Sequence, residues 1–239
     1  MTEISVVLPA YREAENLSNI LPELCAVLRA IGKTFEVLVV DTVEPTDNTA
    51  EICRQNGVTC IARENGNMYG DAIRTGIAHA KGRYIVVMDA DGSHDPRVIR
   101  RMYRVMTEQK PGLVIGSRYC KGGMTDNNAV LRFMSWVLNV TYRVIFGLRV
   151  KDVSDSFRMY RAKQLKTLEL SCDNFDIVEE ILILLHDRWP RARIIEIPIS
   201  FNKRAAGESK RDLVKFIFSY LQTIRRLLKI RRQQGRRHR

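Results

Sequence analysis

The feature that most constrains the fold is a regular alternation of short, β-branched apolar runs with longer amphipathic segments. The apolar runs predict strands at residues 4–9, 35–41, 58–62, 83–89 and 112–116. The amphipathic segments predict helices at residues 13–31, 47–56, 69–80 and 95–107, the last opening on an Asp-Pro pair. Strand and helix in this rhythm indicate an α/β fold, with a mostly parallel sheet and helices on both faces.

Two acidic residues stand where ligands gather in such sheets. Asp41 and Asp89 directly follow the second and fourth apolar runs. In an open parallel sheet, ligands bind beyond the carboxyl ends of the strands. We therefore expect both carboxylates at one crevice.

The segment YIVVMDADGSHDP, residues 84–96, adds Asp91 two positions after Asp89. Two aspartates in a turn are often merely solvated, but they can also hold a divalent cation that binds a diphosphate. Two other nucleotide-binding classes are disfavoured. The chain lacks the GxxxxGK[ST] sequence of P-loop enzymes, and LPAYREAEN stands where a dinucleotide-binding fold would have GxGxxG.

Composition narrows the partners and the compartment. The formal net charge of +12 favours an anionic partner, which could be a phosphate-bearing substrate, nucleic acid or an anionic lipid surface. Five scattered cysteines without a CxxC pair favour neither a disulfide framework nor a zinc site, and they suit a reducing cytoplasm. We find neither a signal peptide nor an apolar run of about 18 residues, so we expect no secretion and no membrane span.

Four segments in this order resemble the inverting family 2 glycosyltransferases: SVVLPAYREAENL, VVDTVEPTDNT, RENGNMYGDAIRTGIAHAKGRYIVVMDADGSHDP and GSRYCKGG. Within that family, they are most similar to dolichyl-phosphate mannose synthases and prokaryotic polyprenyl-phosphate glycosyltransferases. The resemblance implies a GT-A catalytic domain over residues 1–210, followed by a basic amphipathic C-terminal helix and tail over residues 211–239. It also implies inverting transfer of a sugar from GDP-mannose or a UDP-hexose to a polyprenyl phosphate.

The resemblance implies a nucleotide-sugar site. Its expected members are Pro9, Tyr11, Glu13, Asp41, Asp71, Asp89, Ala90 and Asp91. Gly70 would permit a close backbone approach at the helix start beside Asp71. The chain departs from the family at the second strand, where Thr42 replaces the usual second aspartate and one extra residue precedes Asp47. The departure leaves base recognition, and with it the donor, open.

The same resemblance implies that Asp89, Asp91 and Ser93 hold Mg²⁺ or Mn²⁺. The cation would neutralise the leaving nucleoside diphosphate while an acceptor oxygen attacks the anomeric carbon from the opposite face. Asp89, Asp91 and Arg118 are the expected catalytic residues. His94 stands in the same turn, where a single histidine is more typical of a local hydrogen bond than of metal ligation.

The acceptor decides whether a base is needed. A phosphate monoester is already anionic and needs only cationic positioning, whereas a sugar hydroxyl needs a carboxylate base. Residues that match the family's lipid-phosphate positions are Arg118, Arg132, Ser135, Arg204 and Lys210. Any one of them alone fits a solvated basic face, but together they favour a polyprenyl phosphate acceptor.

Another departure keeps a saccharide hydroxyl acceptor as an alternative. Relatives commonly have serine and glycine before the phenylalanine of DVSDSFRMY, where this chain has Asp155 and Ser156, while Asp152 keeps its family place. Asp155 could act as the base for a hydroxyl. Glu179 and Glu180 fall near a family helix acid, and the sequence does not decide which of them corresponds to it.

The C-terminal segment carries an apolar stripe followed by a run of arginines. The stripe consists of Leu213, Ile217, Leu221, Ile224 and Leu228. It fits a helix packed on the domain or one lying on an anionic membrane, and the arginines fit a solubilising tail or lipid headgroups. A nucleic-acid role would explain the arginines but not the acidic turn, so we expect none. We expect a cytoplasmic protein, peripheral on the cytoplasmic face of the membrane.

Overall fold

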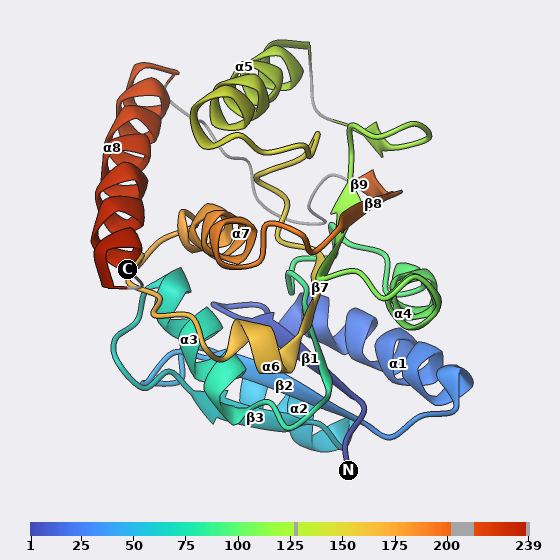
Figure 1. Cartoon of the computed structure of the whole chain (residues 1–239). Coiled ribbons are helices and arrows are strands. Elements are labelled where there is room, and N and C mark those ends of the chain that lie inside the picture. The colour runs from blue at the N-terminus through green and yellow to red at the C-terminus, as the bar shows by residue number, and fades with distance from the viewer. Residues whose placement is uncertain (127–128, 202–212, 238–239) are drawn as a thin grey trace.

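The computed structural model describes residues 1–126, 129–201 and 213–237, and in the last helix it describes the side chains of residues 220–233 (Figure 1). Its centre is a seven-stranded sheet in the order β3-β2-β1-β4-β7-β5-β8. The strands are β1 (Ile4–Pro9), β2 (Phe35–Asp41), β3 (Thr59–Ala62), β4 (Tyr84–Val87), β5 (Leu113–Ser117), β7 (Arg158–Arg161) and β8 (Ile194–Pro198). Strand β7 runs antiparallel to both neighbours, and the other pairs in this sheet are parallel. A small second sheet pairs β6 (Met124–Thr125) with β9 (Ser200–Phe201).

Helices cover both faces of the central sheet. The helices are α1 (Ala14–Ile31), α2 (Thr49–Gln55), α3 (Tyr69–His79), α4 (Val98–Glu108), α5 (Ala129–Phe146), α6 (Ala162–Leu165), α7 (Ile177–Arg188) and α8 (Leu213–Arg237). Helix α5 lies at one end of the molecule (Figure 1). The predicted α/β class, mostly parallel with helices on both faces, is confirmed.

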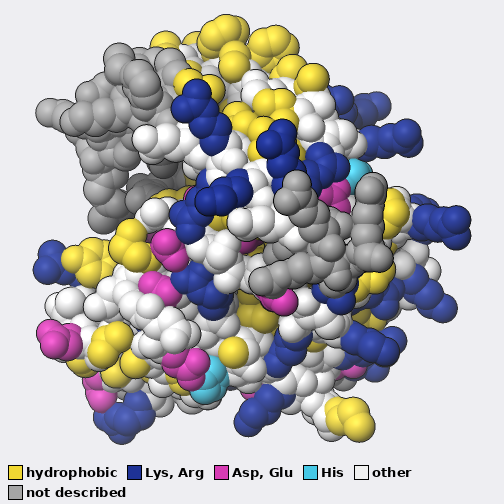
Figure 2. Space-filling view, turned by 60° about the vertical axis from the view of Figure 1, so that its left-hand side comes forward, with side chains coloured by type: hydrophobic (Ala, Val, Ile, Leu, Met, Phe, Trp, Pro, Cys, Tyr) yellow, Lys and Arg dark blue, Asp and Glu magenta, His cyan; other side chains and the backbone are white. Residues whose placement is uncertain are grey.

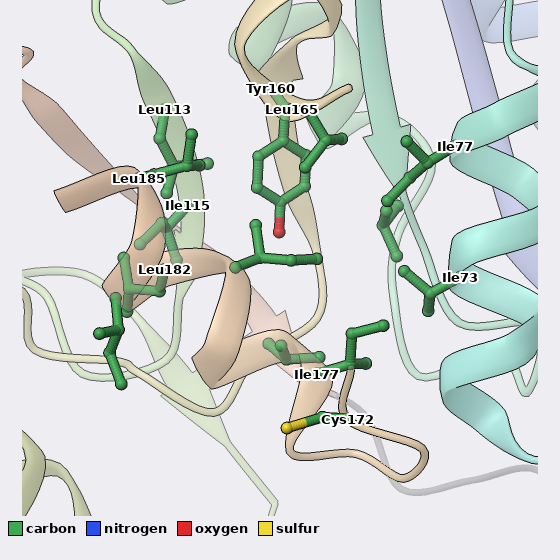
Figure 3. Close-up of a cluster of buried hydrophobic side chains, with 14 of the residues drawn as sticks. Ile73, Ile77, Leu113, Ile115, Tyr160, Leu165, Cys172, Ile177, Leu182 and Leu185 are labelled. Atoms are coloured by element: carbon green, nitrogen blue, oxygen red, sulfur yellow. The ribbon is translucent and has the colours of Figure 1, made fainter. Parts of the chain in front are cut away.

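Side chains that alternate along each strand divide the core into two layers. Val6 and Leu8 of β1 pack with residues of α1 and α4, whereas Val7 packs on the α3 face. Helix α3 lies close to β1 because Gly76 has no side chain, and a Cβ there would come within 2.2 Å of a Val7 methyl group. Figure 3 shows the second layer, in which Tyr160 of β7 lies between side chains of α3 and α7.

The predicted element boundaries need three corrections. The strand before the acidic turn ends at Val87, so Asp89 stands two residues beyond it. The helix predicted from residue 95 begins at Val98, because Asp95 Oδ1 accepts a hydrogen bond from the Arg97 N–H in a turn before the helix. Strand β7, which sequence patterns did not reveal, inserts between β4 and β5.

The described part of α8 packs on the rest of the protein. Ile224 and Leu227 are buried in the core layer that contains α7. Arg226 pairs with Asp173, and Arg231 Nε lies 2.7 Å from Asp187 on α7. Of the predicted apolar stripe, Ile224 is buried, Leu228 is partly buried and Leu221 is exposed, whereas the side chains of Leu213 and Ile217 lie outside the described residues.

Candidate functional site

The topology brings together two loops that are far apart in the sequence. Strand β4 ends at Val87, whose partner across the ladder is Arg158, the first residue of β7. Because β7 is antiparallel, the loop that precedes it lies at the same sheet edge as the loop that follows β4. The acidic turn at residues 88–94 and the loop at residues 151–157 therefore meet.

The acidic turn is preorganised by its own hydrogen bonds. Asp91 Oδ1 accepts one bond from the Ser93 N–H at 3.0 Å and one from the Ser93 hydroxyl at 2.6 Å. Asp89 Oδ1 accepts a bond from the Tyr69 hydroxyl at 3.2 Å. Burial raises the pKa of Asp89, and the charge of Asp91 adds to this effect although His94 opposes it. Two carboxylates in one largely buried turn create a negative potential that a cation would relieve.

The oxygen ligands at this turn fit Mg²⁺ or Mn²⁺, which prefer hard donors. In the part of the chain that the structure describes, no three His, Cys, Asp or Glu side chains form a group that could hold a metal ion. The predicted ligands Asp89, Asp91 and Ser93 share this turn, where the Ser93 hydroxyl donates to Asp91 Oδ1. The metal site stays a prediction.

His94 faces the protein on both sides of its ring. Its Nδ1 accepts a hydrogen bond from the Asp89 N–H at 3.2 Å, and its Nε2 lies 3.4 Å from Asp155 Oδ1. The ring stacks on Phe157, with centroids 4.8 Å apart. This arrangement agrees with the expectation that His94 makes local contacts and is not a metal ligand.

Arg118 is held by a bidentate ion pair. Its Nε and Nη2 donate to the two oxygens of Asp152 at 2.8 and 2.7 Å, and Nη2 also donates to the Ser154 hydroxyl. The guanidinium lies 5.3 Å from the ring centroid of Phe201. Asp152 is itself fixed, because its N–H donates to Glu196 on β8. Planar pairs of this kind set the direction of the guanidinium.

Asp155 is not placed to act as a base. Its Oδ1 accepts a bond from the Phe157 N–H at 2.8 Å, and its Oδ2 lies 3.3 Å from Arg118 Nε. Burial alone would raise the pKa of Asp155, but the neighbouring His94 and Arg118 outweigh it and hold the pKa below its ordinary value. A buried, ionised carboxylate between two partners is a poor acceptor for the proton of a sugar hydroxyl. The geometry therefore does not favour the saccharide-hydroxyl alternative.

The residues expected on the nucleotide side lie at the ends of β1 and β2. Pro9 is buried, as is Ala90 of the acidic turn, and Tyr11 is exposed. Glu13 accepts a hydrogen bond from the Asn16 amide. Asp41 is buried, which raises its pKa, and it accepts a bond from the Thr42 N–H. Their contact with a nucleotide stays a prediction.

Asp47, near the predicted departure from the family, has a structural task. Asp47 Oδ2 accepts a bond from the Ala14 N–H at the start of α1, and Oδ1 accepts one from the Thr49 N–H at the start of α2. One carboxylate thus joins the beginnings of two helices, which satisfies backbone donors that helices leave unpaired.

Gly70 and Asp71 serve the start of α3. A Cβ at Gly70 would lie 2.2 Å from the Cys172 carbonyl oxygen, so the close approach here is to the protein's own backbone. Asp71 accepts a bond from the Met68 N–H and pairs with Arg74 at 2.6 Å. Contact of Asp71 with the nucleotide remains a prediction.

Sequence patterns missed two buried arginines beside the site. Arg63 donates to the carbonyl of Ala10 and to that of Asn67, which joins the end of β1 to the loop before α3. Arg158 donates to the carbonyls of Val153, Asp155 and Val178 and fixes the loop before β7. In the sequence, each of these arginines is visible only as a charged residue beside apolar ones. That pattern does not reveal that the side chain is buried.

The expected acceptor residues are only partly described. Arg132 is exposed and Ser135 is half-buried on α5, whereas Arg204 and Lys210 lie outside the described residues.

The adjacent glutamates on α7, Glu179 and Glu180, differ in their surroundings. Glu180 accepts bonds from Ser171 and Cys172, whereas burial raises the pKa of Glu179 to about 8.

Helix α5 presents apolar side chains to solvent. Leu138, Asn139, Tyr142 and Phe146 are its buried residues. On the outer side, Phe133, Trp136, Val137 and Val144 are exposed and share one face. We call this set the α5 outer face, and Figure 2 shows hydrophobic side chains gathered at that end of the molecule.

The expectation of no spanning helix needs qualification at α5. Residues 129–146 are long and apolar enough to cross a membrane by length and composition, and 22% of the segment is buried in the protein.

A mostly parallel sheet with the acidic turn at its carboxyl edge defines the GT-A class of nucleotide-sugar transferase folds. The sequence model of glycosyl transferase family 2 matches residues 5–168, and the chain belongs to this family. The predicted resemblance is thus confirmed.

Three named relatives are similar over most of the chain. A dolichol-phosphate mannosyltransferase of Pyrococcus furiosus is 32% identical over 95% of this chain and 64% of its own length. An undecaprenyl-phosphate mannosyltransferase of Micrococcus luteus is 31% identical over 87% of this chain and 86% of its own. A dolichol-phosphate mannosyltransferase of Saccharomyces cerevisiae is 30% identical, with coverages of 94% and 86%. The chain spans less than two thirds of the Pyrococcus protein.

Solved structures support the fold. Glucosyl-3-phosphoglycerate synthase from Mycobacterium tuberculosis, in complex with Mn²⁺, UDP and glucosyl-3-phosphoglycerate, aligns with a TM-score of 0.73 at 20% identity, over 95% of this chain and 79% of that one. The same enzyme with Mg²⁺ and UDP gives a TM-score of 0.72 at 20% identity, with the same coverages. At this identity, the likeness shows the fold alone.

Proposed function

We propose that the chain catalyses metal-dependent, inverting transfer of a sugar from a nucleotide-sugar, GDP-mannose or a UDP-hexose, to a polyprenyl phosphate. The observation that carries the proposal is that Asp155, buried and ionised, lies between the acidic turn and Arg118, 3.4 Å from His94 Nε2 and 3.3 Å from Arg118 Nε. An anionic acceptor needs a cation and no base. The polyprenyl-phosphate mannosyltransferases among the relatives support the acceptor class.

In this proposal each side chain has a defined task. Asp89 and Asp91 hold the cation, which would supply charge neutralisation for the leaving nucleoside diphosphate. Arg118, oriented by Asp152, positions the acceptor phosphate so that an ionised oxygen approaches the anomeric carbon from the face opposite the leaving group. Attack from that face inverts the anomeric configuration.

We also propose that the protein works at the surface of a membrane, since the polyprenyl tail of the acceptor stays in the bilayer. The α5 outer face suits insertion at the interface, because an exposed apolar stripe that includes Trp136 favours that environment. On α8, Arg225, Lys229 and Arg232 are exposed. These cations would add attraction to anionic headgroups, at about 1 kcal/mol each.

The test of function is an incubation with radiolabelled nucleotide-sugars, Mg²⁺ or Mn²⁺, and polyprenyl phosphate. We expect the label of one donor to enter the organic phase. A parallel incubation replaces the lipid phosphate with a free saccharide acceptor. Label that enters only the saccharide would contradict the proposal and favour the hydroxyl alternative.

The variant Arg118→Ala sharpens this test. We expect it to impair use of the lipid phosphate about 10²-fold or more, with less than a twofold change in donor affinity. The matched control is Arg97→Ala, since Arg97 is an exposed arginine that pairs only at the surface with Asp95 and Glu23. Equal activity of all three proteins would contradict the role of Arg118.

A further inference from the structure

A continuous set of buried contacts connects the acidic turn with Arg118. The Asp89 N–H donates to His94 Nδ1, and His94 Nε2 lies 3.4 Å from Asp155 Oδ1. Asp155 Oδ2 lies in turn 3.3 Å from Arg118 Nε. Two side chains, His94 and Asp155, therefore connect the part of the site that binds the diphosphate with the part that binds the acceptor.

The side chains that form this connection are shielded from solvent and tightly packed. The side chains of His94 and Asp155 are 0% and 1% exposed. The imidazole stacks on Phe157 and meets the edge of Phe201, with centroids 5.6 Å apart. The Asp155 carbonyl accepts a bond from buried Arg158 at 2.7 Å, so the backbone behind the carboxylate is fixed as well. A shift at one end must therefore be transmitted or resisted by packed groups.

The charge of Asp155 does not increase the attraction between Arg118 and a phosphate. Arg118 is already paired through two hydrogen bonds with Asp152, and a second carboxylate makes its surroundings more negative. What Asp155 adds is a second fixed contact on the Nε side of the guanidinium, which constrains orientation.

We propose that His94 and Asp155 are positioning residues that couple donor binding to acceptor binding. Nucleoside diphosphate and cation at the acidic turn fix the Asp89 backbone, His94 transmits that position to Asp155, and Asp155 holds Arg118 in the orientation that receives the acceptor phosphate. The inference rests on the proposed function. It makes this chain bind its substrates cooperatively.

The test measures the dissociation constant of a short, water-soluble polyprenyl phosphate with and without Mg²⁺ and the nucleoside diphosphate, GDP or UDP, of the active donor. In the wild type we expect about 5- to 10-fold tighter binding with the nucleotide present, a coupling within the usual range. In Asp155→Asn, Asp155→Ser and His94→Asn we expect this ratio to fall to between about 1 and 2. Binding of the lipid phosphate without nucleotide should not weaken in Asp155→Asn, since that variant removes a negative charge near Arg118.

A surface pair of the same chemistry provides the control. His79 Nε2 lies 2.6 Å from Glu64 Oε1, and both side chains are about half exposed. The variants His79→Asn and Glu64→Gln should keep the wild-type ratio. A wild-type ratio in Asp155→Asn, or an equal loss of lipid-phosphate binding with and without nucleotide, would overturn the coupling and leave the proposed function intact. A wild-type protein that does not bind polyprenyl phosphate at all would overturn both.

Discussion

Glu179 provides a pH-dependent test of the packing between α7 and α5. The side chain is 5% exposed, and its Oε2 has no hydrogen-bond partner among the described residues. Burial raises its pKa from the ordinary 4.5 to about 8, although Arg158 opposes the shift. The folded protein therefore holds a proton on this carboxyl at a pH where the unfolded chain has released it.

The direction and size of the effect follow from this difference. Between about pH 4.5 and pH 8 the folded state binds more protons than the unfolded state, so the free energy of unfolding falls as the pH rises through this window. Each unit of pKa difference corresponds to about 1.4 kcal/mol, and the shift of about 3.5 units gives a decrease of about 5 kcal/mol across the window. Above about pH 8 this contribution levels off.

The variant Glu179→Gln removes the titration and keeps the size and shape of the side chain. We expect urea denaturation at pH values from 5 to 9 to show a difference curve, variant minus wild type, that rises with pH toward about 5 kcal/mol. The control is Glu180→Gln, the same substitution at the adjacent buried residue, which weakens the bonds to Ser171 and Cys172 and should lower the free energy of unfolding. Parallel curves for Glu179→Gln and the wild type would mean that Glu179 is ionised and hydrated in the folded protein.

Three further predictions concern the cation, the membrane and the start of α3. Excess EDTA and Asp91→Ala should each lower transfer by about 10²-fold or more, because the leaving diphosphate loses its charge partner; full activity in EDTA would exclude the metal from the reaction. The double variant Phe133→Ser/Trp136→Ser should lose sedimentation with anionic liposomes while keeping nucleotide affinity, and unchanged sedimentation would exclude the α5 outer face as the contact. Gly70→Ala should destabilise the protein by about 1–3 kcal/mol in thermal unfolding, since its Cβ would lie 2.2 Å from the Cys172 carbonyl oxygen; an unchanged midpoint would contradict this close approach.

The sequence predicted those parts of the fold that depend on local patterns. The strands at residues 4–9 and 35–41 follow from uninterrupted apolar runs, and the observed strands have the same boundaries. Strand β7 escaped prediction because its four residues, RMYR, carry arginine at both ends. Its first arginine, Arg158, is buried because its guanidinium donates to carbonyls of the preceding loop and of α7, and no sequence period encodes that arrangement.

In the candidate site, too, only the features that follow from local sequence patterns could be predicted. Asp89 and Asp91 could be placed at a strand end from sequence, because the apolar run and the acids are adjacent. The contact between His94 and Asp155 could not, since it depends on the insertion of β7 beside β4. The sequence also suggested Asp155 as a base, and its burial between two partners became evident only in three dimensions.

The insertion of β7 beside β5 also separates two parts of the candidate site along the chain. The chain leaves the sheet after Ser117 and returns at Arg158, which pairs with Ile115 in the adjacent strand. Arg118, Asp152, Asp155 and the whole of α5 belong to this single excursion, whereas the acidic turn lies outside it. The two ends of the excursion are neighbours in the sheet, so residues 118–157 form one continuous loop region above a fixed strand register. In the proposed function, this region would carry Arg118 and its partners on the acceptor side, whereas the acidic turn on the donor side precedes it in the chain.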